Sequence, residues 1–417
     1  MKILKLSPYY APERISSSHL TEDLEQAYIA AGFDVEIICP TPTRGISDEE
    51  REKYKKIKYE EKYGGRIIIR RFAMMREGRN PVGRALRYVL TNLVQFRKGK
   101  KAESVDIVMG ASTPPTQGIL CGKAAKKLSK KYGKKVPFVY NLQDVFPDSM
   151  VTAGFAKKGG LLWKIGRKIE DRTYGYADRI IVISDDIKKN IMEKGVPEEK
   201  IEIIPNWIDV NEVRHVPREE NKLFDEFGID RERFIVVYAG NLGRAQGIDT
   251  FIDAAKKVRD AEFVIFGTGS SMHEYEERSK DCRNIRMLPL MPKERISEVY
   301  SMGDMSLVAC KKGTGVGAVP SKTFSIMAAG TPVLLSFDEG SALWKLIASK
   351  ACGLCVPADD ADGLAEAVRF AMDHREELRS MGENARRCAE TDYSKECGTS
   401  RYVELLKKTV GLHAGEK

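Results

Sequence analysis

Short apolar runs and amphipathic stretches alternate along the first half of the chain. Runs of β-branched residues predict strands, and apolar positions spaced three to four residues apart predict helices. We expect strands at 2–6, 34–39, 66–71, 106–110, 137–141 and 179–184, and helices at 20–31, 82–96, 117–132, 160–176 and 186–194. This alternation favours a parallel sheet with helices on both faces.

A second alternation follows a charged stretch at 211–230. Its strands are expected at 234–240, 262–266, 285–288, 305–309 and 332–336, and its helices at 248–259, 271–280, 295–302, 362–373 and 376–389. The chain therefore predicts an α/β protein of two facing doubly wound domains, at 1–205 and 206–392. The last segment, 393–417, should hold a helix that crosses back to the first domain. Ligands of such sheets bind beyond the carboxyl ends of the strands.

The segment from Val319 to Val333 has the pattern of a loop, a helix start, a glycine stop and a buried strand. Ser321 is expected to cap the helix and Gly330 to end it. A helix N-terminus offers free N–H groups, and Lys322 adds a positive charge, so the segment is suited to hold a diphosphate. An ordinary helix–strand connection would show the same local pattern and remains the alternative.

Three glycine-containing loops follow predicted strands of the second half, at 240–247, 267–269 and 313–317. Glycine allows the backbone to approach a phosphate closely. None of these loops has the Gly-Lys-Ser/Thr ending of a Walker loop, and Gly313-Thr-Gly-Val-Gly317 lacks the third glycine spacing of a dinucleotide fingerprint. A nucleoside diphosphate is therefore the expected ligand, bound differently than in kinases or dehydrogenases.

Length and composition narrow the class further. The 417 residues are too many for one core. No apolar run reaches the roughly 18 residues of a membrane span, and the first apolar run is too short for a signal peptide. The eight cysteines suggest a reduced, cytoplasmic protein. Cys352-Gly-Leu-Cys355 has metal spacing, but no second pair is near, so we expect a structural role and no metal site.

Positive charge is concentrated between residues 51 and 100, which hold 16 Lys/Arg and 4 Asp/Glu. The rest of the chain has a net charge of −3, so the basicity is a local patch. Within it, the helix at 82–96 has an apolar stripe flanked by cations. Such a helix can lie on an anionic leaflet, or it can pack its stripe on the sheet; nucleic acid and a lipid headgroup are other partners to consider. The expected membrane or acceptor face is Arg76, Arg79, Arg84, Arg87, Arg97 and Lys98.

Beside the 240–247 loop and the 320–333 segment, the chain contains Ser7-Pro-Tyr-Tyr-Ala-Pro12, Val182-Ile-Ser184 and Ile204-Pro-Asn-Trp-Ile-Asp209. Together these motifs resemble those of the retaining GT-B glycosyltransferases of family 4. The variants GNLGxxQG, PSKtfsiMAaG and QDvfPDS are similar to those of bacterial surface-polysaccharide transferases that resemble O-antigen fucosamine transferases. The resemblance implies a UDP-N-acetyl sugar donor, a lipid-linked saccharide acceptor, retention, no metal cofactor, no nucleic acid, and a peripheral place at the cytoplasmic membrane.

The chain departs from the family pattern at several positions. The two carboxylates of the Glu-x7-Glu motif fall on Gly317 and Ser325, and the usual Arg and Lys of the first donor loop fall on Asn241 and Gln246. The glycine pair of the N-terminal loop falls on Ile15 and Ser16, and a common His on Gln143. We therefore expect Arg244 and Lys322 to replace the cationic pair, and backbone N–H groups of 315–318 to contact the donor sugar.

The expected catalytic residues are Arg244, Lys322, Asp144 and His19. His19 could bond a sugar or cap a helix, Asp144 could orient a sugar hydroxyl, and Asp148 is expected to cap a turn. For both Arg244 and Lys322, a solvated surface charge is the alternative. The expected donor-binding residues are Gly240, Asn241, Gly243, Gly267, Gly269, Leu288, Gly315, Gly317, Ala318, Ser321, Thr323, Ser325 and Glu339.

Two other functions fit the same sequence. A sugar-nucleotide 2-epimerase would share the two-domain fold, although the acidic and His residues of such a site are not evident. A non-catalytic binder of an anionic polymer would use the basic patch, and the missing Glu-x7-Glu carboxylates favour it.

Overall fold

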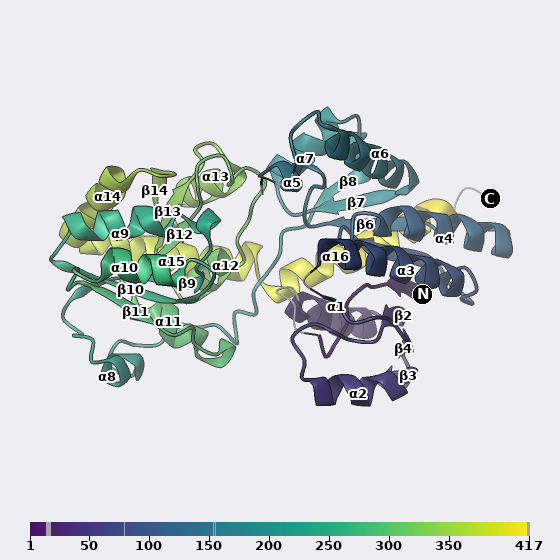
Figure 1. The fold of residues 1–417 in the computed structure, drawn as a ribbon, viewed down its shortest axis with the longest axis horizontal. Coiled ribbons are helices and arrows are strands. Elements are labelled where there is room, and N and C mark those ends of the chain that lie inside the picture. Colours follow the sequence, from purple (N-terminus) through teal and green to yellow (C-terminus); the bar gives the residue numbers. More distant parts are fainter. Residues whose placement is uncertain (14–17, 79, 153, 155, 415–417) are drawn as a thin grey trace. The chain divides into compact units, whose positions relative to one another are not determined.

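The computed structural model describes the chain apart from residues 14–17, 79, 153, 155 and 415–417 (Figure 1). It divides into two compact units. The first holds Met1–Ile183, Ile187–Pro205 and the chain from Thr399 onward, and the second holds Ser184–Asp186 and Asn206–Gly398. The expected α/β class with two parallel-sheet domains is confirmed.

The first unit is built on an eight-stranded sheet of order β3-β4-β2-β1-β5-β6-β7-β8. All neighbours pair in parallel except β3, which runs antiparallel to β4 at one edge. The strands are β1 Lys2–Leu6, β2 Asp34–Pro40, β3 Tyr59–Lys62, β4 Ile67–Phe72, β5 Ile107–Ala111, β6 Phe138–Leu142, β7 Arg179–Val182 and β8 Ile201–Ile203. The helices are α1 Ser18–Ala30, α2 Asp48–Lys56, α3 Pro81–Gly99, α4 Gln117–Tyr132, α5 Asp148–Thr152, α6 Leu161–Tyr176 and α7 Asp185–Glu193.

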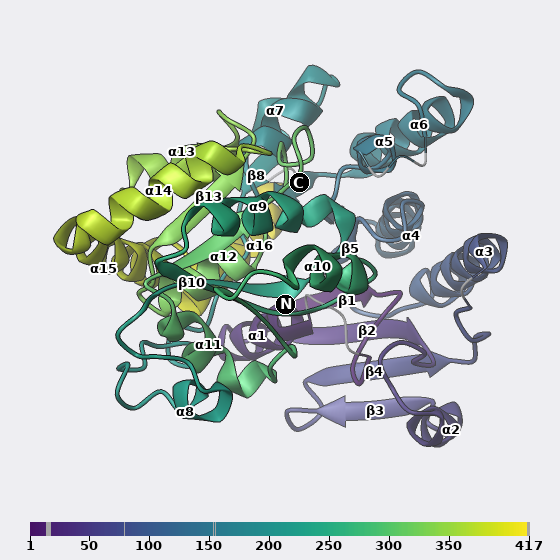
Figure 2. The same ribbon diagram turned by 60° about the vertical axis from the view of Figure 1, so that its left-hand side comes forward.

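Helices cover both faces of this first sheet. Figure 2 shows α3, α4 and α6 in a row along one face, and the contacts α3–α4 and α4–α6 agree. The closing helix α16, Lys395–Ala414, begins in the second unit and belongs to the first from Thr399. There Arg401 donates to the carbonyl oxygen of Ile203, and the Lys407 ammonium lies over the Phe33 ring. The buried Tyr402 adds to this packing.

The second unit has a six-stranded, fully parallel sheet of order β11-β10-β9-β12-β13-β14. Its strands are β9 Phe234–Asn241, β10 Ala261–Thr268, β11 Ile285–Leu288, β12 Met305–Ala309, β13 Val333–Phe337 and β14 Gly353–Pro357. Its helices are α8 Leu223–Phe227, α9 Ile248–Lys257, α10 Met272–Ser279, α11 Ile296–Met302, α12 Lys322–Ala328, α13 Ala342–Ser349, α14 Ala361–Asp373 and α15 Arg375–Asp392. Apolar side chains alternate along the central strands, so one buried cluster forms on each face.

Most predicted elements are present within a few residues of their expected ends. Several short elements were missed: α2, β3, β8, α5, α8, α13 and β14. The strand β14 explains the Cys352-Gly-Leu-Cys355 spacing, because Cys355 lies in this strand and Cys352 just before it. The described residues contain no group of three or more His, Cys, Asp or Glu side chains placed to hold a metal.

Candidate functional site: a buried lysine at the strand ends of the second unit

Lys322 opens helix α12 and directs its ammonium into the protein. The Nζ atom is buried 3.8 Å from the centroid of the Tyr238 ring. Among the residues that the structure describes, Nζ has no hydrogen-bond partner. Burial lowers the pKa of Lys322 from 10.5 to about 7, since a desolvated ammonium without a counter-charge is disfavoured. Such an ammonium is ready to receive an anion.

Gly240 creates the space that this ammonium fills. A Cβ at Gly240 would lie 2.8 Å from the Lys322 Nζ, and the backbone there has a φ of +144°, which side chains rarely adopt. The neighbouring Asn241 is exposed at the end of β9, and its carbonyl oxygen accepts from the Tyr238 hydroxyl at 2.7 Å. The end of β9 and the start of α12 thus form one small site.

The helix termini of α12 follow the expected pattern only in part. Gly330 ends the helix with a φ of +70°, as predicted. Ser321 occupies the N-cap position, but its backbone is helical and its side chain makes no cap hydrogen bond, so the predicted cap is wrong. Thr323 is buried, and its hydroxyl has no hydrogen-bond partner among the described residues. Ser325 is half-buried on the same helix.

Most backbone N–H groups of the 313–318 loop already have acceptors within the protein, which argues against their expected role with the donor sugar. Gly313 and Gly315 each donate to Asp338 at 2.7 Å, and Gly317 donates to Asp186 at 3.2 Å. Ala318 donates to the carbonyl oxygen of Gly315. Carboxylates of the protein itself therefore fill this loop, and the lysine ammonium is the more available group for an anion.

The remaining predicted donor residues have mixed surroundings. A Cβ at Gly267 would meet the Leu242 side chain, and one at Gly269 the Leu242 backbone, so close chain packing accounts for both glycines. Gly243 lies similarly close to the Asn241 side chain. Leu288 is half-buried at the end of β11, and Glu339 is exposed after β13. The sequence reasoning missed Tyr238, although its place two residues before Gly240 in an apolar strand was visible.

Arg244 lies in a short 3-10 turn, Arg244–Gln246, directly after β9. Its side chain is exposed, and none of the described residues forms a hydrogen bond or ion pair with it. This position is compatible with both sequence interpretations, the phosphate ligand and the solvated charge.

In the first unit, the predicted acceptor residues lie near strand ends. His19 is the second residue of α1, and Asp144 is exposed shortly after β6. Asp148 begins α5 and accepts from Trp163 at 3.1 Å and from Asn190 at 3.0 Å, with Lys194 at 2.8 Å. Asp148 therefore has a structural role.

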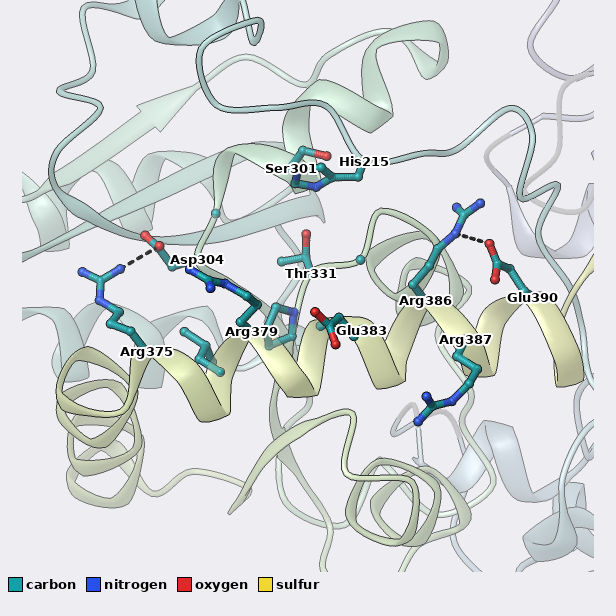
Figure 3. Close-up of a pocket in the computed structure, with 15 residues that line it drawn as sticks. His215, Ser301, Asp304, Thr331, Arg375, Arg379, Glu383, Arg386, Arg387 and Glu390 are labelled. Atoms are coloured by element: carbon teal, nitrogen blue, oxygen red, sulfur yellow. Dashed lines mark hydrogen bonds and ion pairs between the residues drawn. The ribbon is translucent and has the colours of Figure 1, made fainter.

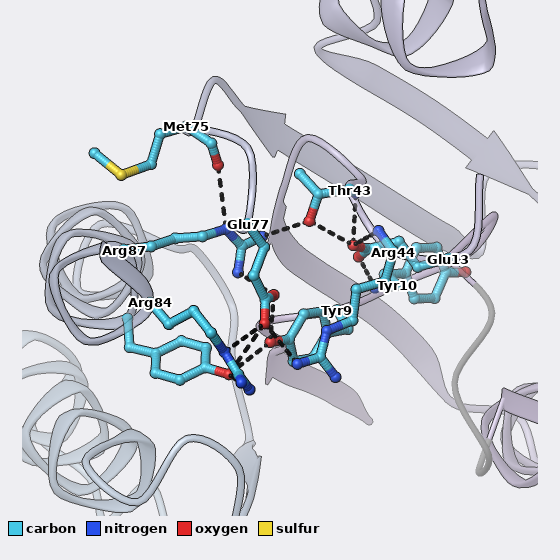
Figure 4. A network of polar contacts seen from close by, with 10 residues as sticks. Tyr9, Tyr10, Glu13, Thr43, Arg44, Met75, Glu77, Arg84 and Arg87 are labelled. Carbon is cyan, nitrogen blue, oxygen red and sulfur yellow. Dashed lines mark hydrogen bonds and ion pairs between the residues drawn. The ribbon is translucent and has the colours of Figure 1, made fainter. Parts of the chain in front are cut away.

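Only some residues of the predicted basic face lie on the protein surface. Arg97 and Lys98 are exposed, and Arg76 is exposed beside Asp48. Arg87 is 0% exposed and pairs with Glu77, so its expected place on the face is wrong: the helix turns it inward (Figure 4). Arg84 is half-buried against the same carboxylate. The predicted Arg79 lies outside the described residues.

Most of the apolar stripe of α3 is exposed, which the sequence left open. Val82 is 76% exposed, and Leu86, Val89 and Leu93 are close to half exposed. A second exposed group, missed by the sequence reasoning, lies on α6 in the same helix layer. It consists of Leu161, Leu162 and Ile165. No helix among the described residues is both long and apolar enough to cross a membrane.

In the second unit, a groove of about 760 Å³ lies at the strand ends opposite to those near Lys322 (Figure 3). Its walls are α15 and the residues just before β12 and β13, so it is at the amino ends of these strands. Three of its four arginines are engaged: Arg375 pairs with Asp304, Arg387 donates to the Asn384 side chain, and Arg386 pairs with Glu390 and donates to the carbonyl oxygens of Val210 and Val213. The groove is therefore separate from the Lys322 site.

Comparisons with known proteins agree with this architecture. Residues 18–212 match the family described as Glycosyltransferase Family 4, and residues 219–388 match Glycosyl transferases group 1. A protein of Escherichia coli K12, named as the colanic acid biosynthesis glycosyl transferase WcaI, is 25% identical over 386 residues, 89% of this chain and 92% of WcaI.

Solved structures show the same fold at low identity. The sucrose-phosphate synthase of Thermosynechococcus elongatus gives a TM-score of 0.76 at 15% identity over 99% of both chains. Alr3699/HepE of Anabaena, solved in complex with UDP and glucose, gives 0.71 at 14% identity over 98% of this chain and 100% of its own. With these matches, neither the epimerase nor the non-catalytic binder is retained. The chain is a glycosyltransferase of the GT-B fold, with a family 4 domain followed by a group 1 domain.

Proposed function

We propose that this glycosyltransferase transfers a sugar, with retention, from a UDP-N-acetyl sugar to a lipid-linked saccharide in surface-polysaccharide synthesis. The observation that carries the proposal is the buried Lys322 ammonium without a counter-charge at the end of β9. The name of WcaI, which refers to colanic acid, and the UDP complex of the HepE structure support the acceptor class and the donor class.

The chemistry requires the departing diphosphate to be stabilised as its charge develops. Fixed positive groups in a desolvated site do this best. Lys322 meets both conditions, because its ammonium is buried and is held over Tyr238. Arg244 is exposed in the short turn after β9, and its side chain would contact the diphosphate from the solvent side. A diphosphate beside Lys322 would raise the pKa of this lysine again, so that binding of the donor would restore its full charge.

A screen of nucleotides by thermal unfolding tests the proposal directly. A ligand at free concentration L that binds only the native state stabilises it by RT ln(1 + L/Kd), so the unfolding midpoint rises with the logarithm of ligand concentration above Kd. We expect UDP and UDP-N-acetyl sugars to raise it, and guanosine or adenosine diphosphates to leave it unchanged. If calorimetry detects no binding of any uridine nucleotide at millimolar concentration, the proposed donor is wrong.

Donor binding should depend on pH through Lys322. In the free protein the pKa of Lys322 is about 7, so the lysine is largely neutral at pH 8.5 and largely charged at pH 5.5. Since the diphosphate favours the charged form, binding above pH 7 must take up a proton. We expect the affinity for a UDP-sugar to fall about tenfold between pH 7.5 and 8.5.

Calorimetry in two buffers of different ionisation enthalpy measures this proton uptake. The uptake should approach one proton per donor at pH 8.5 and vanish at pH 5.5, which serves as the internal control. An affinity that stays constant from pH 6 to 8.5, with no proton uptake, would place the diphosphate away from Lys322.

The acceptor side of the proposal rests on the first unit. Exposed apolar side chains of α3 and α6 lie in one helix layer, and exposed cations accompany both groups, among them Arg97, Lys98 and Lys164. Apolar residues with flanking cations are the composition of surfaces that lie on anionic leaflets. We therefore infer a peripheral position on the membrane, where the lipid-linked acceptor resides.

A further inference from the structure

Three arginines converge on one carboxylate at the carboxyl edge of the first sheet (Figure 4). The Glu77 Oε1 atom lies 2.5 Å from Arg44 Nη2 and 3.2 Å from Arg84 Nε. Its Oε2 atom lies 3.3 Å from Arg87 Nη1 and accepts from the Tyr9 hydroxyl at 2.8 Å. Arg44 follows β2 and Glu77 follows β4, while the other two arginines come from the first turns of α3. Loops from several strand ends thus build one charged cluster.

The three arginines differ in what they can still bind. Arg87 is completely buried and also donates to the Met75 carbonyl and the Thr43 hydroxyl, both at 3.2 Å. It is a structural anchor for Glu77. The side chains of Arg44 and Arg84 remain 37% and 42% exposed. Because both reach the same oxygen of Glu77, their guanidinium groups lie next to each other with an outer side in solvent.

The cluster has more positive than negative charge. Three guanidinium groups surround one carboxylate, and the next carboxylate, Glu13, accepts from the backbone N–H groups of Thr43 and Arg44 at 2.7 and 3.1 Å. Even with Glu13 included, the group keeps a net positive charge. Paired guanidinium groups favour phosphate, whose oxygens accept the parallel N–H donors of the arginine fork.

The exposed apolar stripe of α3 begins at this cluster. Arg84 lies in the same turn as Val82 and Leu86, which are 76% and 51% exposed. A phosphate-binding pair beside an apolar helix face suits a ligand with a phosphate at the end of a hydrocarbon chain. On the basis of the proposed function, we propose that Arg44 and Arg84 bind the phosphate groups that join lipid and saccharide in the acceptor.

Vesicle sedimentation with two lipid compositions tests this site. One set of neutral phosphatidylcholine vesicles carries a polyprenyl diphosphate, and the other carries phosphatidylglycerol at equal surface charge. We expect the full-length protein to bind the first set at least tenfold more tightly. The double variant Arg44→Gln/Arg84→Gln should lose this preference, while UDP binding, which belongs to the other unit, stays unchanged.

Two further variants separate recognition from folding and from general charge. Arg84→Lys keeps a cation against Glu77 but lacks the fork, so it should fold normally and still lose at least threefold of the preference. Arg97→Gln/Lys98→Gln, at the far end of α3, should weaken binding to both vesicle types equally.

Several outcomes would overturn the inference. Equal binding of the wild-type protein to both vesicle types would show that any anionic headgroup suffices. A folded Arg44→Gln/Arg84→Gln protein with the full preference would place the phosphates elsewhere. Because this assay needs no turnover, a diphosphate preference without transfer to any lipid-linked saccharide would contradict the proposed function and leave the phosphate site in place.

Discussion

Replacing Lys322 with methionine should weaken donor binding and make the protein more stable. The buried ammonium has no counter-charge among the described residues, so the folded state bears a desolvation cost. With a pKa near 7 in the folded protein and 10.5 as the ordinary value, that cost is at most about 5 kcal/mol. Methionine is close to lysine in length and has no charge to desolvate, so the space beside Gly240 stays filled.

The gain in stability should itself depend on pH. The unfolded chain holds the Lys322 proton up to about pH 10.5, whereas the folded chain releases it near pH 7. The wild-type protein is therefore penalised fully below pH 7, and the penalty fades as pH rises toward 10.5. Urea unfolding at pH 6.5 and 9.5 should show a larger difference in free energy of unfolding between Lys322→Met and wild type at the lower pH.

Turnover should fall in the same variant by one to three orders of magnitude, roughly the 2–4 kcal/mol of a lost transition-state donor. Arg244→Ala should slow turnover by a similar factor without a gain in stability, because Arg244 is exposed. Lys350→Met is the matched control: its ammonium pairs with Asp392 at 2.8 Å on the surface, where water screens the pair, so its loss should change stability little. A Lys322→Met protein that is less stable than wild type and binds UDP as tightly would contradict the assignment.

The sequence located this lysine but not its surroundings. The pattern around 319–333 marks a helix start, and that is where Lys322 stands. The burial of its ammonium depends on Tyr238 and on the missing side chain of Gly240, which are about 80 residues away in the chain. The same limit explains the error at the 313–318 loop, since Asp186 reaches Gly317 from a distant segment. A loop sequence shows which N–H groups exist, but it does not show what already occupies them.

The helix pattern at 82–96 predicts which residues share a face of the helix, but it places one charged side chain wrongly. The stripe of Val82, Leu86 and Leu93 was recognised as one face, while its exposure could not be decided, because a stripe that packs on a sheet has the same spacing. The same pattern places Arg87 among the cations that flank the stripe, and so on the surface. Its partner is Glu77, in the loop before the helix, and the helix pattern does not include it.

Membrane binding should require both the charges and the apolar residues of α3, and the two contributions should differ in how they depend on salt concentration. Each Lys or Arg near an anionic surface contributes about 1 kcal/mol, so Arg97→Glu/Lys98→Glu, which reverses two exposed charges, should weaken binding to anionic vesicles by at least 100-fold at low salt. This loss should shrink as ionic strength rises, because the Debye length falls to about 8 Å at physiological salt. Arg84 and Arg87 are left unchanged, since both support Glu77.

The apolar contribution should behave differently. Leu86 and Leu93 are about half exposed, and insertion of such side chains contributes about 1 kcal/mol each. Leu86→Asp/Leu93→Asp should therefore weaken vesicle binding at every salt concentration, and Leu162→Asp on α6 should add to the loss if the two helices lie on one leaflet. Lys345→Glu/Lys408→Glu, two exposed charges outside α3 and α6, is the control for net charge and should have little effect. Vesicle binding that disappears equally in this control would reflect overall charge alone, and the α3 stripe would then need another partner.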